Sequence, residues 1–132
     1  MTISTSLVTG VDFVCLPTQD LDAAREFYGT VLGLEAGGVW QRGDAPARGA
    51  EFQAGNLTLS VVDPSAIGIE FQATKVPVAL HVEDIEAARA ELETRGVSFF
   101  GDTMDTGVCF MAPFSDPDGN ALMLHHRYAP RT

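Results

Sequence analysis

The stretch FVCLPTQDLDAAREFY, residues 13–28, decides how the chain folds, because its pattern returns as PVALHVEDIEAARAEL at residues 77–92. Apolar strand positions, an aspartate and an Ala-Ala-Arg triplet recur at matching places, and the aspartates Asp20 and Asp84 define an offset of 64 residues. Two such units account for nearly all of the 132 residues. The sequence therefore predicts two diverged and fused copies of one structural unit.

Each unit is predicted to begin with a strand and a helix. The β-rich runs 11–17 and 76–82 predict the strands. Asp20 and Asp84 stand where an N-cap carboxylate accepts backbone N–H groups of the first helical turn, and Gly33 and Gly96 are placed to end the helices. Three further strands follow in each unit, at 35–42, 48–54 and 57–63 in the first and at 97–101, 106–113 and 120–127 in the second.

The expected fold class is α+β, a single domain over residues 1–132 made of two βαβββ modules related by a pseudo-twofold. Module 1 covers about 11–63, a linker about 64–75, and module 2 about 76–127. One helix covers only one face of a four-stranded sheet, so the other face must cover a partner sheet or a ligand. We therefore expect an open concave cleft between the modules.

Composition narrows the classes of function. Apolar residues make up 45% of the chain and charged residues 20%, which is typical of a soluble domain with its own core. No run approaches the roughly 18 apolar residues that span a membrane, and MTISTSLVTG lacks the features of a signal peptide, so we expect a cytoplasmic protein. Cys15 and Cys109 are accordingly expected to be buried free thiols. The net charge of −10 disfavours nucleic acid as a partner; it gives solubility or favours a cationic ligand.

Two motifs carry a family resemblance. DLDAAREFYGTVLGLE at 20–35 and DPDGN at 116–120, within two βαβββ units, resemble the vicinal oxygen chelate superfamily of glyoxalases, bleomycin-resistance proteins and dioxygenases. The resemblance runs from Val11 to about Arg127. It implies the paired-module fold and, in metal-using members, a divalent ion held by His, Glu or Gln on the first and fourth strands of each module. It also implies a homodimer with clefts at the subunit contact, in which units are either kept within a chain or exchanged.

The family's metal-ligand positions carry residues that do not suit a hard cation. These positions map to Phe13, Ser60, Pro77 and Met123. A slip of one residue offers Asp12 at the first position, but a slip reverses strand sidedness and leaves the other three positions without ligands. We therefore expect no metal and no cofactor, and the sequence favours a non-enzymatic protein over an enzyme.

Two alternatives, a metal site and an enzyme, stay open. A displaced site could use His81 and His125 together with Cys15 or Asp12. An atypical lyase, isomerase or thiol transferase of the same superfamily would use such a site or none. A third alternative is a homologue whose cleft is filled by its own side chains.

The leading hypothesis is a small-molecule binding protein that sequesters an amphipathic ligand, cationic or neutral, in an apolar cleft. The candidate ligand-binding residues are Phe13, Trp40, Ser60, His81, Phe110, Met123 and His125. Trp40 offers a ring on which flat ligands stack, Met123 adapts to irregular shapes, and the two histidines offer hydrogen bonds. Ordinary structural roles stay open for each, as do anchoring or solvated surface roles for Glu51 and Glu70.

Overall fold

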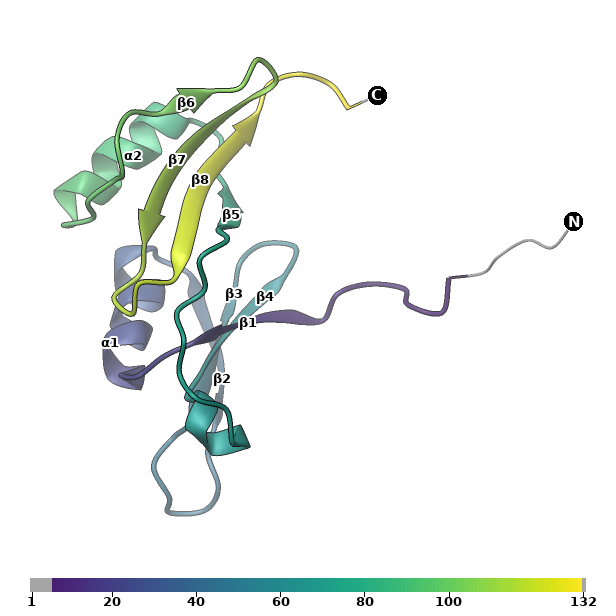
Figure 1. Cartoon of the computed structure of the whole chain (residues 1–132), viewed down its shortest axis with the longest axis vertical. Helices are drawn as coiled ribbons and strands as arrows, with labels where there is room; N and C mark the ends of the chain where they lie inside the picture. The colour runs from purple at the N-terminus through teal and green to yellow at the C-terminus, as the bar shows by residue number, and fades with distance from the viewer. Residues whose placement is uncertain (1–5, 132) are drawn as a thin grey trace, which may run out of the picture.

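The computed structural model describes residues 6–131. The N-terminal segment considered above for a signal peptide therefore falls partly outside the described residues. Two four-stranded sheets with the same topology form the body of the protein, in the orders β1-β4-β3-β2 and β5-β8-β7-β6 (Figure 1). In each sheet the first and fourth strands pair in parallel, and the other pairs are antiparallel. The predicted α+β class with two repeated modules is confirmed.

The elements follow each other twice in the same order. The first sheet contains β1 (Phe13–Pro17), β2 (Glu35–Trp40), β3 (Gly49–Gln53) and β4 (Thr58–Val62). The second contains β5 (Val78–His81), β6 (Met104–Asp105), β7 (Cys109–Ser115) and β8 (Ala121–Arg127). The helical elements are α1 (Leu21–Glu26), the π-helical turn η1 (Phe27–Val31), the 3-10 turn η2 (Pro64–Ile67) and α2 (Ile85–Thr94). Within residues 6–131, none of the helices has the length and apolar character needed to cross a membrane.

The helix ends confirm the signals seen in the repeat. The carboxylates of Asp20 and Asp84 each accept the backbone N–H three residues further on, at 3.1 and 3.0 Å. Gly33 and Gly96 adopt φ values of 75° and 95°, a left-handed backbone that residues with a Cβ avoid. The same local chemistry therefore starts and ends the helical segment in both modules.

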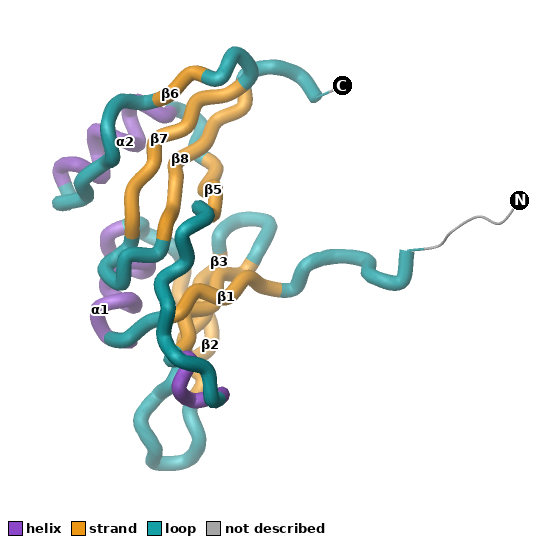
Figure 2. The backbone as a smooth tube through the Cα atoms, in the orientation of Figure 1, coloured by secondary structure: helices purple, strands orange, loops and turns teal. Residues whose placement is uncertain are grey.

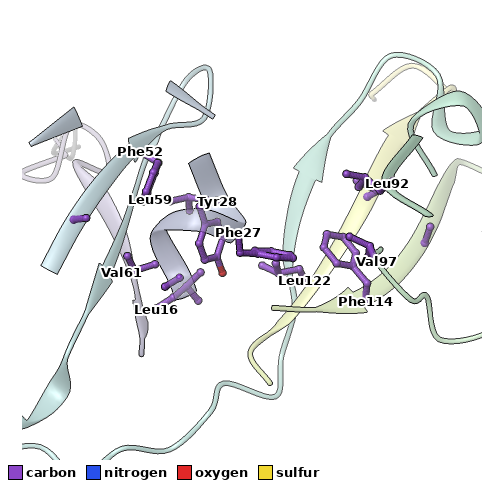
Figure 3. Packing of buried hydrophobic residues seen from close by; sticks show 14 of the residues in the cluster. Leu16, Phe27, Tyr28, Phe52, Leu59, Val61, Leu92, Val97, Phe114 and Leu122 are labelled. Atoms are coloured by element: carbon purple, nitrogen blue, oxygen red, sulfur yellow. The ribbon is translucent and has the colours of Figure 1, made fainter. Parts of the chain in front are cut away.

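The first helical segment lies between the two sheets and joins their cores (Figure 3). Phe27 and Tyr28 are consecutive and both buried, yet their rings reach different sheets. The Tyr28 ring lies 6.0 Å from that of Phe52 in the first sheet, and the Phe27 ring lies 6.4 Å from that of Phe114 in the second. Leu32 N–H bonds the Phe27 carbonyl at 2.9 Å, the five-residue spacing of a π-helical turn. The two modules thus share one continuous hydrophobic core.

A buried polar cluster also joins the modules. The Tyr28 hydroxyl donates to Oδ2 of Asp116 at 2.6 Å, and Asn120 Nδ2 donates to the same oxygen at 2.8 Å. Asn120 Nδ2 also donates to the Pro17 carbonyl at 2.8 Å. Burial, followed by the hydrogen bond to Asp116, raises the pKa of Tyr28 well above its ordinary value. The DPDG turn, closed by the Gly119 N–H on the Asp116 carbonyl at 3.0 Å, holds this cluster in place.

The predicted strand at 97–101 is wrong. In this segment only Phe99 forms a bridge, to Phe114, and the rest is loop (Figure 2). The guanidinium of Arg89 donates to the Gly101 carbonyl at 2.7 Å and lies 4.8 Å from the Phe99 ring centre. The Arg89 side chain is only 16% exposed, and it holds the loop against α2. A tertiary contact therefore overrides the strand propensity of this segment.

Candidate ligand-binding site

A cavity of 720 Å³ opens on the face of the first sheet that is turned away from α1. Its floor comes from side chains of all four strands, and one wall comes from the linker that follows β4. The floor includes Phe13, Cys15, Trp40, Glu51 and Ser60, and the wall includes Pro64, Ile67, Ile69, Glu70 and Gln72. The volume falls within the range of about 300–1,000 Å³ that is typical of small-molecule sites.

Three of the predicted binding residues line this cavity. They are Phe13, Trp40 and Ser60. Phe13 and Trp40 are 52% and 40% exposed, so their rings lie open in the cavity. A Cβ added at Gly49 would meet the Trp40 ring at 3.4 Å, which shows how closely the indole lies over the backbone of β3. The tightest contact of such a Cβ would be with the Val61 carbonyl oxygen, at 3.1 Å.

A polar row crosses this otherwise apolar floor. Ser60 on β4 is in register with Cys15 on β1 and with Glu51 on β3, so the three side chains stand side by side across adjacent strands. Ser60 is only 8% exposed, and its hydroxyl has no hydrogen-bond partner among residues 6–131. A Glu51 carboxylate oxygen lies 3.2 Å from where a Cβ on Gly38 would stand. The missing side chain at Gly38 therefore leaves space for this carboxylate beside β2.

The charge of the lining is entirely negative. Among the described residues that line the cavity, the charged ones are Glu51 and Glu70. Neither forms an ion pair or a side-chain hydrogen bond within residues 6–131. The cavity thus presents two carboxylates and an apolar surface, and no basic side chain is found among the described residues that line it.

The other predicted binding residues lie outside this cavity. Met123 and His125 are on β8 and His81 is on β5, all on the face of the second sheet that is turned away from α2. His81 bonds Glu83 at 2.9 Å, and this contact holds the pKa of the Glu83 carboxyl below its ordinary value. Phe110 lies on the opposite, helix-facing side of its sheet, with its ring centre 4.9 Å from that of Tyr128. One chain alone therefore does not bring the seven residues together.

The residues at the family's metal positions do not fit a metal ion. Phe13 and Ser60 lie in the cavity, whereas Pro77 directly precedes β5 and Met123 belongs to the second sheet. Of the four, only Ser60 offers an oxygen, and hard divalent ions require several oxygen or nitrogen donors. Across residues 6–131, no three His, Cys, Asp or Glu side chains lie together as a possible metal-binding group. The enzymatic alternative stays a prediction.

Sequence reasoning missed two features of the site. Cys15 was expected to be buried, but it is exposed because it alternates with buried Leu16 and faces the cavity; Cys109 is buried, as predicted. The linker was expected only to connect the modules, yet Ile67 and Ile69 form part of the cavity wall. The available signal was the presence of large apolar residues in a segment without strand or helix periodicity.

The fold and the site agree with a comparison against known families. The sequence model of the glyoxalase/bleomycin resistance protein/dioxygenase superfamily matches residues 10–124, and the chain belongs to this superfamily. Comparison with curated proteins gave no significant match.

Solved structures of several members resemble the chain over nearly its full length. The antibiotic binding protein TnmS3 from a Streptomyces species is 25% identical with a TM-score of 0.76, covering 93% of this chain and 99% of that chain. A superfamily member from Nocardioides is 23% identical with a TM-score of 0.73, covering 97% and 93%. A lactoylglutathione lyase from Agrobacterium tumefaciens is 19% identical with a TM-score of 0.69, covering 91% and 95%. The fold is therefore shared by binding proteins and enzymes, and the site must decide between them.

Proposed function

We propose that this protein is a metal-free small-molecule binding protein that sequesters an amphipathic ligand in the cavity of the first sheet. The observation that carries the proposal is the set of large apolar side chains exposed within that cavity, since exposed apolar patches of this kind mark binding surfaces. They are Phe13, Val39, Trp40, Ile67 and Ile69, each between 40% and 59% exposed. The likeness to an antibiotic binding protein supports the same function.

The affinity would come from burial of flat apolar surface. Removing apolar surface from water contributes on the order of 25 cal/mol per Å², and a ring stacked on Trp40 adds to this. Binding also costs translational and rotational freedom, which a partly preformed cavity reduces for the protein side. The proposed binding requires no covalent step.

The proposal includes a homodimer. Leu7, Val8 and Val11 precede β1 and are 97%, 75% and 67% exposed, so the segment carries apolar surface that a second copy would cover. Figure 1 shows this segment leading away from the two sheets. A second copy would also bring the open face of its second sheet, where Met123 and His125 lie, toward the cavity. Light scattering on a size-exclusion column should give twice the mass of the 14.1 kDa chain.

The proposal also includes a cytoplasmic location. Both cysteines of the chain are unpaired in the structure, as is usual in a reducing compartment. Alkylation of the freshly purified protein without reductant should label Cys15 rapidly, and Cys109 only after unfolding.

The test of the binding function is titration of the purified protein with a panel of flat and amphipathic compounds, including a cationic glycopeptide antibiotic. Trp40 is the only tryptophan, so quenching of its fluorescence reports occupancy of the cavity directly. Calorimetry on Trp40→Ala should then show binding weakened about tenfold or more, because a buried aromatic anchor is lost. Phe100→Ala, at an exposed ring outside the cavity, is the matched control. Absence of both quenching and heat across the whole panel would contradict the proposed function.

A further inference from the structure

The Ser60 hydroxyl is the first sign of what the ligand must carry. Ser60 is 8% exposed as a residue and lines the cavity, and within residues 6–131 its hydroxyl bonds no other side chain or backbone group, so the hydroxyl is free to contact a ligand. Its neighbours in register are the Cys15 thiol, a weak hydrogen-bonding group, and the Glu51 carboxylate. A polar group of the ligand placed over this row would therefore meet a hydroxyl and a carboxylate at once.

The two carboxylates of the lining indicate the sign of the charge on the polar group of the ligand. Glu51 lies on the cavity floor beside Gly38, and Glu70 lies on the linker wall. No arginine, lysine or histidine of the described chain lines the cavity, so nothing in the lining balances these charges. Beside apolar walls the interaction of a carboxylate with a cation is stronger than in open water. An anionic ligand would be repelled, and a cationic one would be attracted.

Trp40 indicates the shape of the ligand that carries this positive charge. Its indole lies over Gly49 on the same floor and remains 40% exposed, so one face is open to a flat ring. Indole is also the aromatic ring that attracts cations most strongly. Aromatic stacking and a carboxylate therefore act on the same ligand from neighbouring positions of the first sheet.

We propose that the ligand is a flat aromatic or heteroaromatic amine, positively charged at neutral pH. Its ring stacks on Trp40, and its amine lies over the polar row, where it pairs with Glu51 and donates a hydrogen bond to Ser60. Glu70 adds a second negative charge from the linker wall. This inference rests on the proposed binding function and specifies the chemical class of the ligand.

The experiment compares two probes of nearly the same shape and different charge. 9-Aminoacridine is a cation at mildly alkaline pH, whereas acridine is neutral there. Both are titrated into the full chain by calorimetry and by quenching of Trp40. We expect 9-aminoacridine to bind about tenfold more tightly than acridine, since one well-placed charge contact changes affinity by about that factor. Cys15, the exposed cysteine of the pair, should be protected from a thiol reagent by the bound probe.

Two variants and a matched control locate the effect. Glu51→Gln should reduce the preference for 9-aminoacridine about fivefold, and Ser60→Ala should weaken 9-aminoacridine binding by a similar factor. Glu35→Gln removes the same charge from β2 of the same sheet, at a residue outside the cavity lining, and should leave the preference unchanged. Circular dichroism and thermal unfolding of each variant establish that it is folded.

The outcomes separate this inference from the proposed function. Equal binding of both probes would overturn the charge assignment and leave the binding function in place. Binding of neither probe, with no binding across the wider panel, would overturn both. If Glu51→Gln changes the mass of the protein in solution but not the ratio of the two affinities, the carboxylate serves a contact between copies and the inference fails.

Discussion

Replacing Tyr28 by phenylalanine tests how the two modules are held together. The substitution removes one hydroxyl group and leaves the aromatic ring in place. That hydroxyl comes from the first module and donates to Asp116 of the second, 88 residues further along the chain. The ring itself keeps its contacts with Phe27, at a centroid distance of 5.2 Å, and with Phe52.

The size of the effect follows from the burial of the pair. Tyr28 has no exposed surface, Asp116 is 6% exposed, and the oxygen–oxygen distance is 2.6 Å. A hydrogen bond to a charged group contributes about 1.5–3 kcal/mol, and solvent does not screen this one. In the variant, Oδ2 of Asp116 still accepts the hydrogen bond from Asn120 Nδ2 at 2.8 Å, so this oxygen is not left without a partner. We expect Tyr28→Phe to lower the free energy of unfolding by about 2 kcal/mol.

The assay is equilibrium unfolding in urea, followed by far-ultraviolet circular dichroism. The matched control is Tyr128→Phe, which removes a hydroxyl that also bonds a carboxylate at 2.6 Å, that of Asp105, but at the protein surface. The control should lose much less stability, because exposed contacts of this kind are weak. If Tyr28→Phe cost no more than its surface counterpart, the buried cluster would not be what stabilises the contact between modules.

Three further predictions concern the pH dependence and the core. Because folding raises the pKa of Tyr28, its protonated hydroxyl contributes fully to the free energy of unfolding below the unfolded pKa of about 10, and this contribution decreases as the pH rises above that value. Above about pH 10 the free energy of unfolding should therefore fall more steeply in the wild type than in Tyr28→Phe. The hydrogen bond from Ser65 lowers the pKa of Asp63, so the difference in urea midpoint between wild type and Asp63→Asn should be present at neutral pH and shrink as pH falls below about 4. Phe114→Ala should cost about 4 kcal/mol in urea unfolding, because the ring is 1% exposed, whereas Phe100→Ala at a 65% exposed ring should cost far less.

Most of the fold could be predicted because its signals are local and occur twice. The aspartate caps and the terminal glycines depend only on chemistry within one helical turn, and both copies behave as expected. The strand predicted at 97–101 failed for the opposite reason. Its conformation depends on Arg89, which lies on another element and holds the segment as a loop. Sequence patterns of strand and loop do not report such a contact.

The candidate site could be predicted only in part. Phe13, Ser60 and Trp40 were found because the family resemblance locates the first and fourth strands and because Trp40 is the only tryptophan. Glu51 was raised only as an alternative anchor and Cys15 not as a pocket residue, although both are in register with Ser60, because the register between strands is set by pairing that a single sequence does not show. Whether the residues on the second sheet join the site depends on the proposed homodimer.

The linker after β4 has a consequence for how this protein can change. Ile67 and Ile69 border the cavity, yet each keeps more than half of its surface exposed, so neither contributes much to the shared core. Substitutions here should change which ligands bind while altering the free energy of unfolding very little. In a chain assembled from a duplicated pattern, selectivity can thus be adjusted in a segment that lies outside the repeated units.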